Sequence, residues 1–122
     1  MIKNPSDLSI EWVNRRYEEL TGMCLKDIRG KKVGELWADP ESAALIEKHD
    51  RDALNKDFTI LVEEVSVRDR GKQHRLRIRF PIKGPDGRVR YLGAVGLGIE
   101  RLLRSVDQEK LVSFVGELAG EL

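Results

Sequence analysis

Few residues in this chain of 122 have the types and spacing that enzyme chemistry requires. The sequence contains one cysteine, Cys24, and two histidines, His49 and His74. The acids Glu63 and Glu64 are adjacent in a segment of strand-like composition, so their side chains point to opposite faces and cannot act as a pair of carboxylates. Neither a glycine-rich phosphate loop nor a metal-ligand spacing occurs in the sequence. We therefore expect that this chain is not an enzyme.

Arginines form the main charged pattern. Two consecutive strand-like segments carry them at alternate positions: Arg75, Arg77 and Arg79, then Arg88 and Arg90. Such a stripe could neutralise the phosphates of a nucleic acid. However, 22 Lys and Arg are balanced by 21 Asp and Glu, and the arginine face has no aromatic residue for base stacking. We predict a solvated outer face on which Glu63 pairs with the arginines, and no nucleic-acid partner.

Composition restricts the class of protein further. A chain of this length can bury roughly two-thirds of the surface that it exposes when unfolded, enough for one domain without disulfides or metal. A lone cysteine cannot form an internal disulfide, which favours the reducing cytoplasm. The longest apolar stretch, residues 91–99, includes three glycines and is far shorter than the ~20 residues that cross a bilayer. We expect a cytoplasmic domain without a membrane-inserted segment.

The first half of the chain predicts one short strand and two helices. Alternation of apolar and polar residues over 9–14 predicts the strand. Asn14 can cap a short helix, which Gly22 would end. Asp39, followed by a proline, can open a longer helix over about residues 41–56.

After these helices apolar residues recur at every second position, which indicates strands at 58–67, 74–81 and 88–97. Turns at 69–71 and 84–87 would join them into an antiparallel meander. One face of this meander is apolar, and we expect it to cover the core: Leu76, Ile78, Phe80, Val89, Tyr91, Val95 and Leu97.

The period becomes helical again over residues 100–122. Ser105 or Asp107 could cap a new start, so the segment is either one helix or two. Its apolar positions include Leu102, Leu103, Val106, Leu111, Phe114 and Leu118. Because a helix cannot cover its own apolar stripe, we expect it to pack against the sheet or a partner.

The order of these elements resembles that of a PAS domain, and five short motifs resemble the family in more detail. They are residues 2–4 with 12–22, residues 27–31, residues 50–54, residues 80–82 and residues 85–89. The resemblance covers about residues 1–101 and implies an α+β fold. This is a five-stranded, antiparallel, curved sheet with short helices and one longer helix over its concave face. We assign residues 1–99 to this domain and residues 100–122 to a C-terminal amphipathic exit helix.

The resemblance also implies a ligand cleft on the concave face. Candidate cleft residues are Trp12, Asn14, Trp37, Ile46, Leu76, Ile78, Phe80, Tyr91 and Val95. Of these, Trp12, Asn14 or Tyr91 would supply the few polar groups that such sites use. A core filled by the same residues, without any ligand, is the alternative interpretation.

Two cofactors known from the family can be weighed against residues. Light-sensing members hold flavin through a cysteine in the short pocket helix, but residues 30–36 contain none, so we do not expect a covalent flavin switch. Cys24 lies earlier, where we expect a small buried apolar side chain. Haem-binding members ligate iron through a histidine on the long helix, and His49 lies there, although its neighbours Lys48 and Asp50 are hydrophilic. Haem ligation through His49 is a third hypothesis.

The family's usual partners complete the prediction. PAS domains commonly dimerise and transmit conformational change through an exit helix to a kinase, a cyclase or a similar output domain. Here the chain has Gly98, Ile99 and Glu100 where the family often has Asp-Ile-Thr. The first hypothesis is a homodimeric sensor module of bacterial signal transduction that binds a small molecule. The second is a purely structural homodimerisation module without ligand.

Overall fold

The computed structural model describes residues 1–67, 69–99 and 108–121. In chain order the elements are β1 (Ile2–Lys3), β2 (Ile10–Trp12), α1 (Arg15–Thr21), α2 (Leu25–Ile28), the 3-10 turn η1 (Val33–Glu35), α3 (Pro40–Ala53), β3 (Thr59–Val67), β4 (Gly71–Lys83), β5 (Val89–Gly98) and α5 (Gln108–Glu121). The strands form one antiparallel sheet in the order β2-β1-β5-β4-β3. The predicted α+β fold with five antiparallel strands is confirmed.

The helix boundaries follow from local capping. The Asn14 side chain accepts a hydrogen bond from the Tyr17 N–H, and Gly22 ends α1 in the left-handed region at φ 70°. The Asp39 side chain accepts from the Ser42 N–H at the start of α3. Both predicted helix starts are confirmed, but α3 ends three residues before the expected residue 56, after its last buried residue, Ala53.

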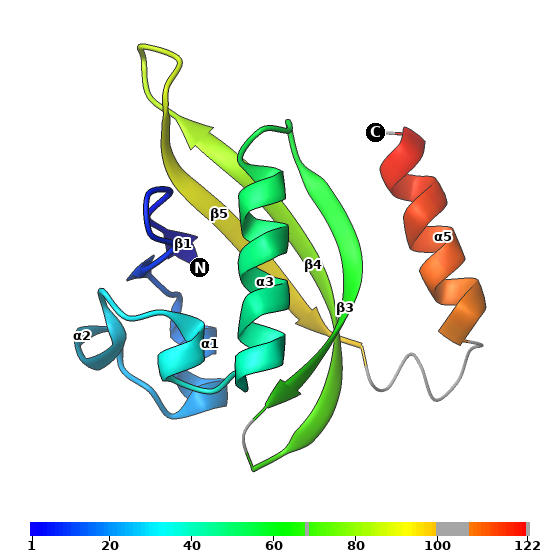
Figure 1. Cartoon of the computed structure of the whole chain (residues 1–122), viewed down its shortest axis with the longest axis horizontal. Helices are drawn as coiled ribbons and strands as arrows, with labels where there is room; N and C mark the ends of the chain where they lie inside the picture. Colours follow the sequence, from blue (N-terminus) through cyan, green and yellow to red (C-terminus); the bar gives the residue numbers. More distant parts are fainter. Residues whose placement is uncertain (68, 100–107, 122) are drawn as a thin grey trace.

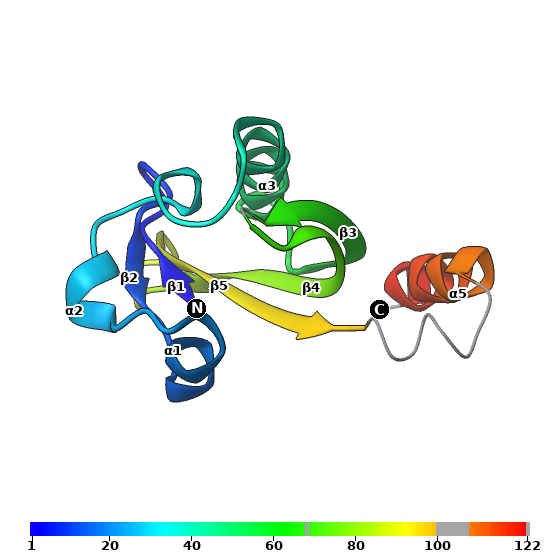
Figure 2. The same cartoon turned by 90° about the horizontal axis from the view of Figure 1, so that it is seen from below.

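Helix α3 lies across one face of the sheet, and α1, α2 and η1 lie at its side (Figures 1 and 2). The main core cluster joins β2, α2, η1, α3 and β3 and comprises Ile10, Val13, Ile28, Val33, Trp37, Ala38, Ile46 and Val65. A smaller cluster of Leu8, Ala53 and Leu92 packs where α3 ends over β5. The core therefore lies between the sheet and its helices, on one side of the sheet only.

The predicted assignment of the two sheet faces was wrong. Arg77 and Arg79 are only 7% and 1% exposed and lie beneath α3, whereas Val95 and Leu97 are 44% and 52% exposed. Pairing across the sheet aligns Val95 with Ile78 and Leu97 with Leu76, so these residues share the outer face. Alternation alone separates two faces of a strand but does not say which face a helix will cover. The arginines of β4 therefore do not lie on the outside of the sheet, and the apolar stretch that contains Leu76 and Ile78 lies on the outer face.

Two glycines of β5 leave room for large side chains of β4. A Cβ at Gly93 would lie 2.4 Å from the Phe80 ring on the outer face, and one at Gly96 would lie 2.8 Å from an Arg77 nitrogen on the inner face. The Phe80 ring and the Arg77 guanidinium therefore lie across β5 on opposite sides of the sheet.

Helix α5 lies beside β3, as Figure 1 shows, and its Val115 is buried. Phe114 is exposed and Leu118 is half-buried. The other residues predicted for this surface lie outside the described residues or have undescribed side chains: Leu102, Leu103, Val106 and Leu111. Whether a second helix starts at Ser105 or Asp107 falls in the same undescribed segment.

We predict that Gly93→Ala destabilises the protein, because the new methyl group would overlap the Phe80 ring. Overpacking of this kind costs about 1–3 kcal/mol. Gly98→Ala, in the same strand with no atom within 4 Å of its Cβ, is the matched control and should be nearly neutral. Urea unfolding of both variants measures the difference, and equal stabilities would contradict the close approach of Phe80.

Candidate functional site

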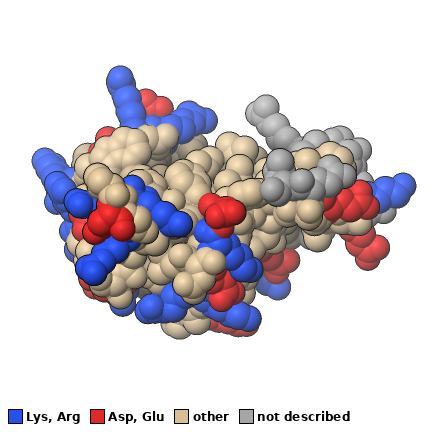
Figure 3. Space-filling model, turned by 90° about the horizontal axis from the view of Figure 1, so that it is seen from above, with Lys and Arg blue, Asp and Glu red and all other residues tan. Residues whose placement is uncertain are grey.

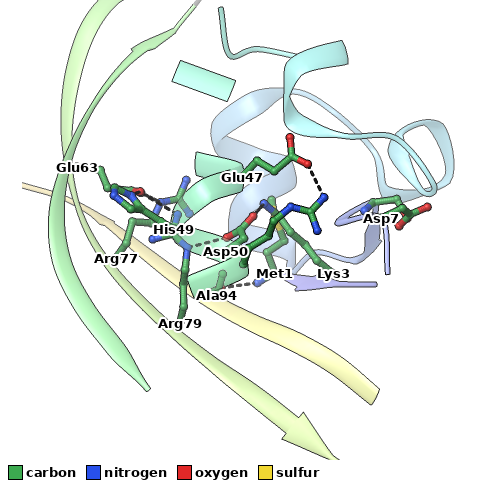
Figure 4. A network of polar contacts seen from close by, with 12 residues as sticks. Met1, Lys3, Asp7, Glu47, His49, Asp50, Glu63, Arg77, Arg79 and Ala94 are labelled. Carbon is green, nitrogen blue, oxygen red and sulfur yellow. Dashed lines mark hydrogen bonds and ion pairs between the residues drawn. The ribbon is translucent and has the colours of Figure 1, made fainter. Parts of the chain in front are cut away.

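The inner face of the sheet carries a buried ionic network centred on Asp50 of α3 (Figure 4). Lys3 of β1 donates from Nζ to Asp50 Oδ2 at 2.6 Å. Arg79 of β4 donates from Nε to Asp50 Oδ1, also at 2.6 Å. All three side chains are at least 95% inaccessible to solvent. Burial lowers the pKa of Lys3, and Asp50 opposes this effect.

Glu63 of β3 is the second buried carboxylate of the network. It accepts two hydrogen bonds from Arg79 Nη2, at 2.9 and 3.0 Å, and its Oε2 also contacts His49 Nδ1 of α3. The side chains converge from β3, β4 and α3 in Figure 4. The network thus ties three sheet strands, including β1, to the helix that covers them.

Arg77 is the least satisfied member of the network. Its Nε lies 3.4 Å from Glu63 Oε1, but this contact lacks hydrogen-bond geometry. Burial lowers the pKa of Arg77 to about 10, and the negative charge of Glu63 partly offsets the effect. Arg79 Nη1 is likewise buried without an acceptor among the described residues. Buried donors without acceptors are rare in folded proteins and unfavourable.

A pocket of about 350 Å³ opens at one end of this face. Its lining is Thr21, Met23, Leu36, Trp37, Val67, Asp69, Arg70 and Arg75. The Arg75 guanidinium lies 5.0 Å from the Trp37 ring centroid, within the range of a cation–π interaction. Trp37 Nε1 donates to the Tyr17 hydroxyl at 3.0 Å. Burial lowers the pKa of Arg75 and raises the pKa of Tyr17.

A second, smaller cavity of about 80 Å³ lies on the other side of the network. Lys3 and Asp50 line it together with Leu8, Val33, Ala43 and Ile46, and Lys32 and Glu47 also border it. Its volume can hold one or two waters rather than a metabolite.

The structure divides the predicted cleft residues into two groups. Trp37 and Ile46 line the two cavities. Leu76, Ile78, Phe80, Tyr91, Val95 and Trp12 belong to the outer face, where Trp12 aligns with Gly93 through Ile2. Asn14 is exposed and caps α1. The prediction that these last seven residues face the cleft was therefore wrong.

The sequence did not predict the buried network, because alternation along β4 was interpreted as placing its arginines on the solvent-exposed face of the sheet. The pairing of Glu63 with the arginines was correct, but on the opposite face. One signal was available in α3, whose buried residues are Ser42, Ile46, Asp50 and Ala53. A carboxylate inside an otherwise uncharged helical stripe requires a buried cation opposite it.

The residues do not fit a haem or a covalent flavin. His49 lies on α3 as predicted, but it contacts Glu63 in a charged cluster rather than lining a large apolar pocket. Cys24 is exposed at the start of α2, so its predicted burial was wrong. No group of three metal-binding side chains occurs within residues 1–67, 69–99 and 108–121.

On the face of the molecule seen in Figure 3, charges of both signs are interspersed. Figure 3 shows Lys and Arg side chains with Asp and Glu among them and uncharged surface between. Among the described residues, no helix is long and apolar enough to cross a membrane.

We predict that Arg79→Met destabilises the fold strongly, because it leaves Asp50 and Glu63 buried with fewer donors. Breaking a buried ion pair from one side costs about 3–5 kcal/mol. Arg51→Met is the matched control, since Arg51 pairs with Glu47 on the exposed side of α3 and such pairs contribute about 1 kcal/mol or less. Denaturant unfolding compares them; similar losses in both variants would contradict a buried network.

The comparisons with known structures agree on the fold. VqmA bound to DPO matches 80% of this chain and 49% of its own, with a TM-score of 0.66 and 17% identity. The Drosophila melanogaster Cycle PAS-B domain with bound ethylene glycol matches 80% and 95%, with a TM-score of 0.61 and 13% identity. The light state of the Aureochrome1 LOV domain matches 91% and 89%, with a TM-score of 0.62 and 19% identity.

The chain spans about half the length of VqmA. No protein of curated function matches it in sequence. A family model described as the PAS fold matches residues 5–104, which is most of the chain. With the antiparallel sheet and its covering helices in place, the chain belongs to the PAS family.

Proposed function

We propose that this PAS domain is a non-catalytic sensor module that binds a small molecule at the pocket on the inner face of its sheet. The observation that carries this proposal is the polar character of that face. Trp37, Tyr17 and Arg75 surround one end of it, and Arg77 lies beside them with a buried donor that has no acceptor. Ligand pockets typically combine apolar walls with a few placed polar groups.

The alternative is a purely structural module with a filled core. Buried charges are a poor means of filling a core, because apolar residues of similar volume often give equal or greater stability. The pocket volume of about 350 Å³ lies at the lower end of the range for small-molecule sites. Two relatives of the same fold are described with DPO and with ethylene glycol bound. These points together favour a ligand-binding module.

Signalling would use the sheet and α5. The pocket borders β3 through Val67 and β4 through Arg75, and α5 lies against β3. A ligand that shifts these strands would shift the support of α5. We propose that an attached or partner output domain, such as a kinase or cyclase, receives this change. The lone cysteine favours a cytoplasmic setting.

We predict that a compound co-purifies with the protein or stabilises it in a thermal-shift screen of neutral and charged metabolites. Met23→Trp should abolish this stabilisation, because the indole would fill the pocket that Met23 lines. Leu20→Trp, an exposed position on α1 outside the lining, should not. Native mass spectrometry identifies any bound mass. No bound compound and no stabilisation would support the structural alternative.

The outer face of the sheet supports dimerisation through a surface other than the exit helix. Large apolar side chains are exposed to solvent on this face, among them Trp12, Tyr91, Val95 and Leu97. Contiguous apolar surface of this kind commonly marks an interaction site. We propose that the outer face of one protomer packs against the same face of a second.

We therefore predict that Leu97→Glu converts a dimer into a monomer, because the carboxylate would be buried without a partner. Leu20→Glu is the matched control, since Leu20 is 57% exposed on α1. Sedimentation velocity across a concentration series measures both variants. A wild-type monomer at all concentrations, or a Leu97→Glu dimer, would rule out this interface.

A further inference from the structure

The inner face of the sheet holds more positive charge than its carboxylates balance. Three buried cations, Lys3, Arg77 and Arg79, accompany two buried carboxylates, Asp50 and Glu63, which leaves an excess of one positive charge when His49 is neutral. Charges removed from water are costly unless they are balanced.

Arg75 adds a fourth cation to this face. Its Nη2 donates to the amide oxygen of Gln73 at 3.0 Å, a neutral acceptor. No ion pair joins it to a carboxylate within the part of the chain that the structure describes. The excess of positive charge therefore extends along β4 to Arg75, which lines the pocket.

In the observed arrangement Glu63 does not form a hydrogen bond with Arg77 in addition to its present partners. Both of its oxygens accept from Arg79, and one also contacts His49. Arg77 Nε consequently remains a buried donor in an ion pair of 3.4 Å without hydrogen-bond geometry. An additional acceptor on this face would complete the network.

The lining of the pocket includes Arg75 but not Arg77. Arg77 follows Arg75 by two residues on the same face of β4, roughly 7 Å along the strand. Tyr17 interacts electrostatically with both arginines. Met23 and Leu36 supply apolar wall to the same pocket, and the Trp37 ring lies beneath the Arg75 guanidinium. The two guanidinium groups and the apolar wall can therefore contact different ends of one small molecule.

We propose that the ligand is a small organic carboxylate, with its carboxylate held by Arg75 and Arg77 and its apolar part against Trp37. This inference rests on the proposed ligand-binding function and specifies its ligand class. The planar guanidinium fork matches a carboxylate through paired hydrogen bonds. One carboxylate also balances the one excess charge of the buried cluster formed by Lys3, Arg77, Arg79, Asp50 and Glu63.

The test uses carboxylates paired with their uncharged primary amides. Benzoate, phenylacetate and indole-3-acetate are compared with the corresponding amides, and with inorganic phosphate, by thermal shift and calorimetric titration of the full chain. We expect at least one carboxylate to bind and its amide to bind roughly tenfold to a hundredfold more weakly. Amides that bind as well as their acids, no binding by any of the acids, or tighter binding of phosphate would overturn the proposal.

Arg77→Met separates a ligand-binding role from a structural one. Because Arg79 and His49 still hold Glu63, we expect the unliganded variant to be at least as stable as wild type while losing carboxylate affinity. Arg75→Met should also lose affinity without altering the buried cluster. Arg88→Met, at an exposed arginine of the β4–β5 turn, should change neither property. Unchanged affinity in both Arg75→Met and Arg77→Met, or marked loss of stability in unliganded Arg77→Met, would overturn the proposal.

These results also distinguish this inference from the function on which it rests. A neutral compound that stabilises wild type but not Met23→Trp would leave the ligand-binding function in place and overturn the carboxylate assignment. If no compound of either kind binds, both proposals fail.

Discussion

The structure depends on the ion pair between Asp50 and Arg79. Asp50 is the only charged side chain among the buried residues of α3, and Arg79 lies on β4 between strands β5 and β3. Their contact at 2.6 Å joins α3 to the face of β4 that the helix covers, and Lys3 and Glu63 extend the network to β1 and β3. Removing either partner would leave an unpaired buried charge and lower the stability of the fold. The pair also holds α3 against β4, because one partner lies on each element.

This ion pair has consequences on both faces of the sheet. With the arginines directed inward, Leu76, Ile78, Phe80, Val95 and Leu97 must face outward, because neighbouring residues of a strand alternate. The result is an inner face rich in charge and an outer face rich in apolar surface. A sheet arranged in this way offers a polar site beneath its helices and a separate apolar surface for another protein chain. Ligand binding and dimerisation therefore need not compete for the same residues.

Local signals in the sequence predicted the positions of helices and strands well. They did not predict which face of each strand is covered by α3. Asn14, Gly22 and Asp39 act on backbone groups within a few residues of themselves, so their capping roles could be predicted. The facing of β4 depends on Asp50, which is 29 residues distant in the chain from Arg79. Hydrophobicity favoured the apolar face as the buried one, and only the pairing of buried charges reverses that choice. The pocket could not be predicted, since Met23, Trp37 and Arg75 meet only after folding.

Arg77 and Arg79 are buried on the inner face of the sheet, beneath α3. Nitrogen-15 NMR of arginine side chains tests this burial directly, because Nε–H protons exchange slowly with water when they are buried. We predict slow exchange for the Nε–H of Arg79 and Arg77, and fast exchange for Arg15 and Arg88, which are exposed at the surface. Exchange of the Arg77 and Arg79 Nε–H groups as fast as that of Arg15 and Arg88 would show that the arginine face is solvated and would contradict their burial beneath α3.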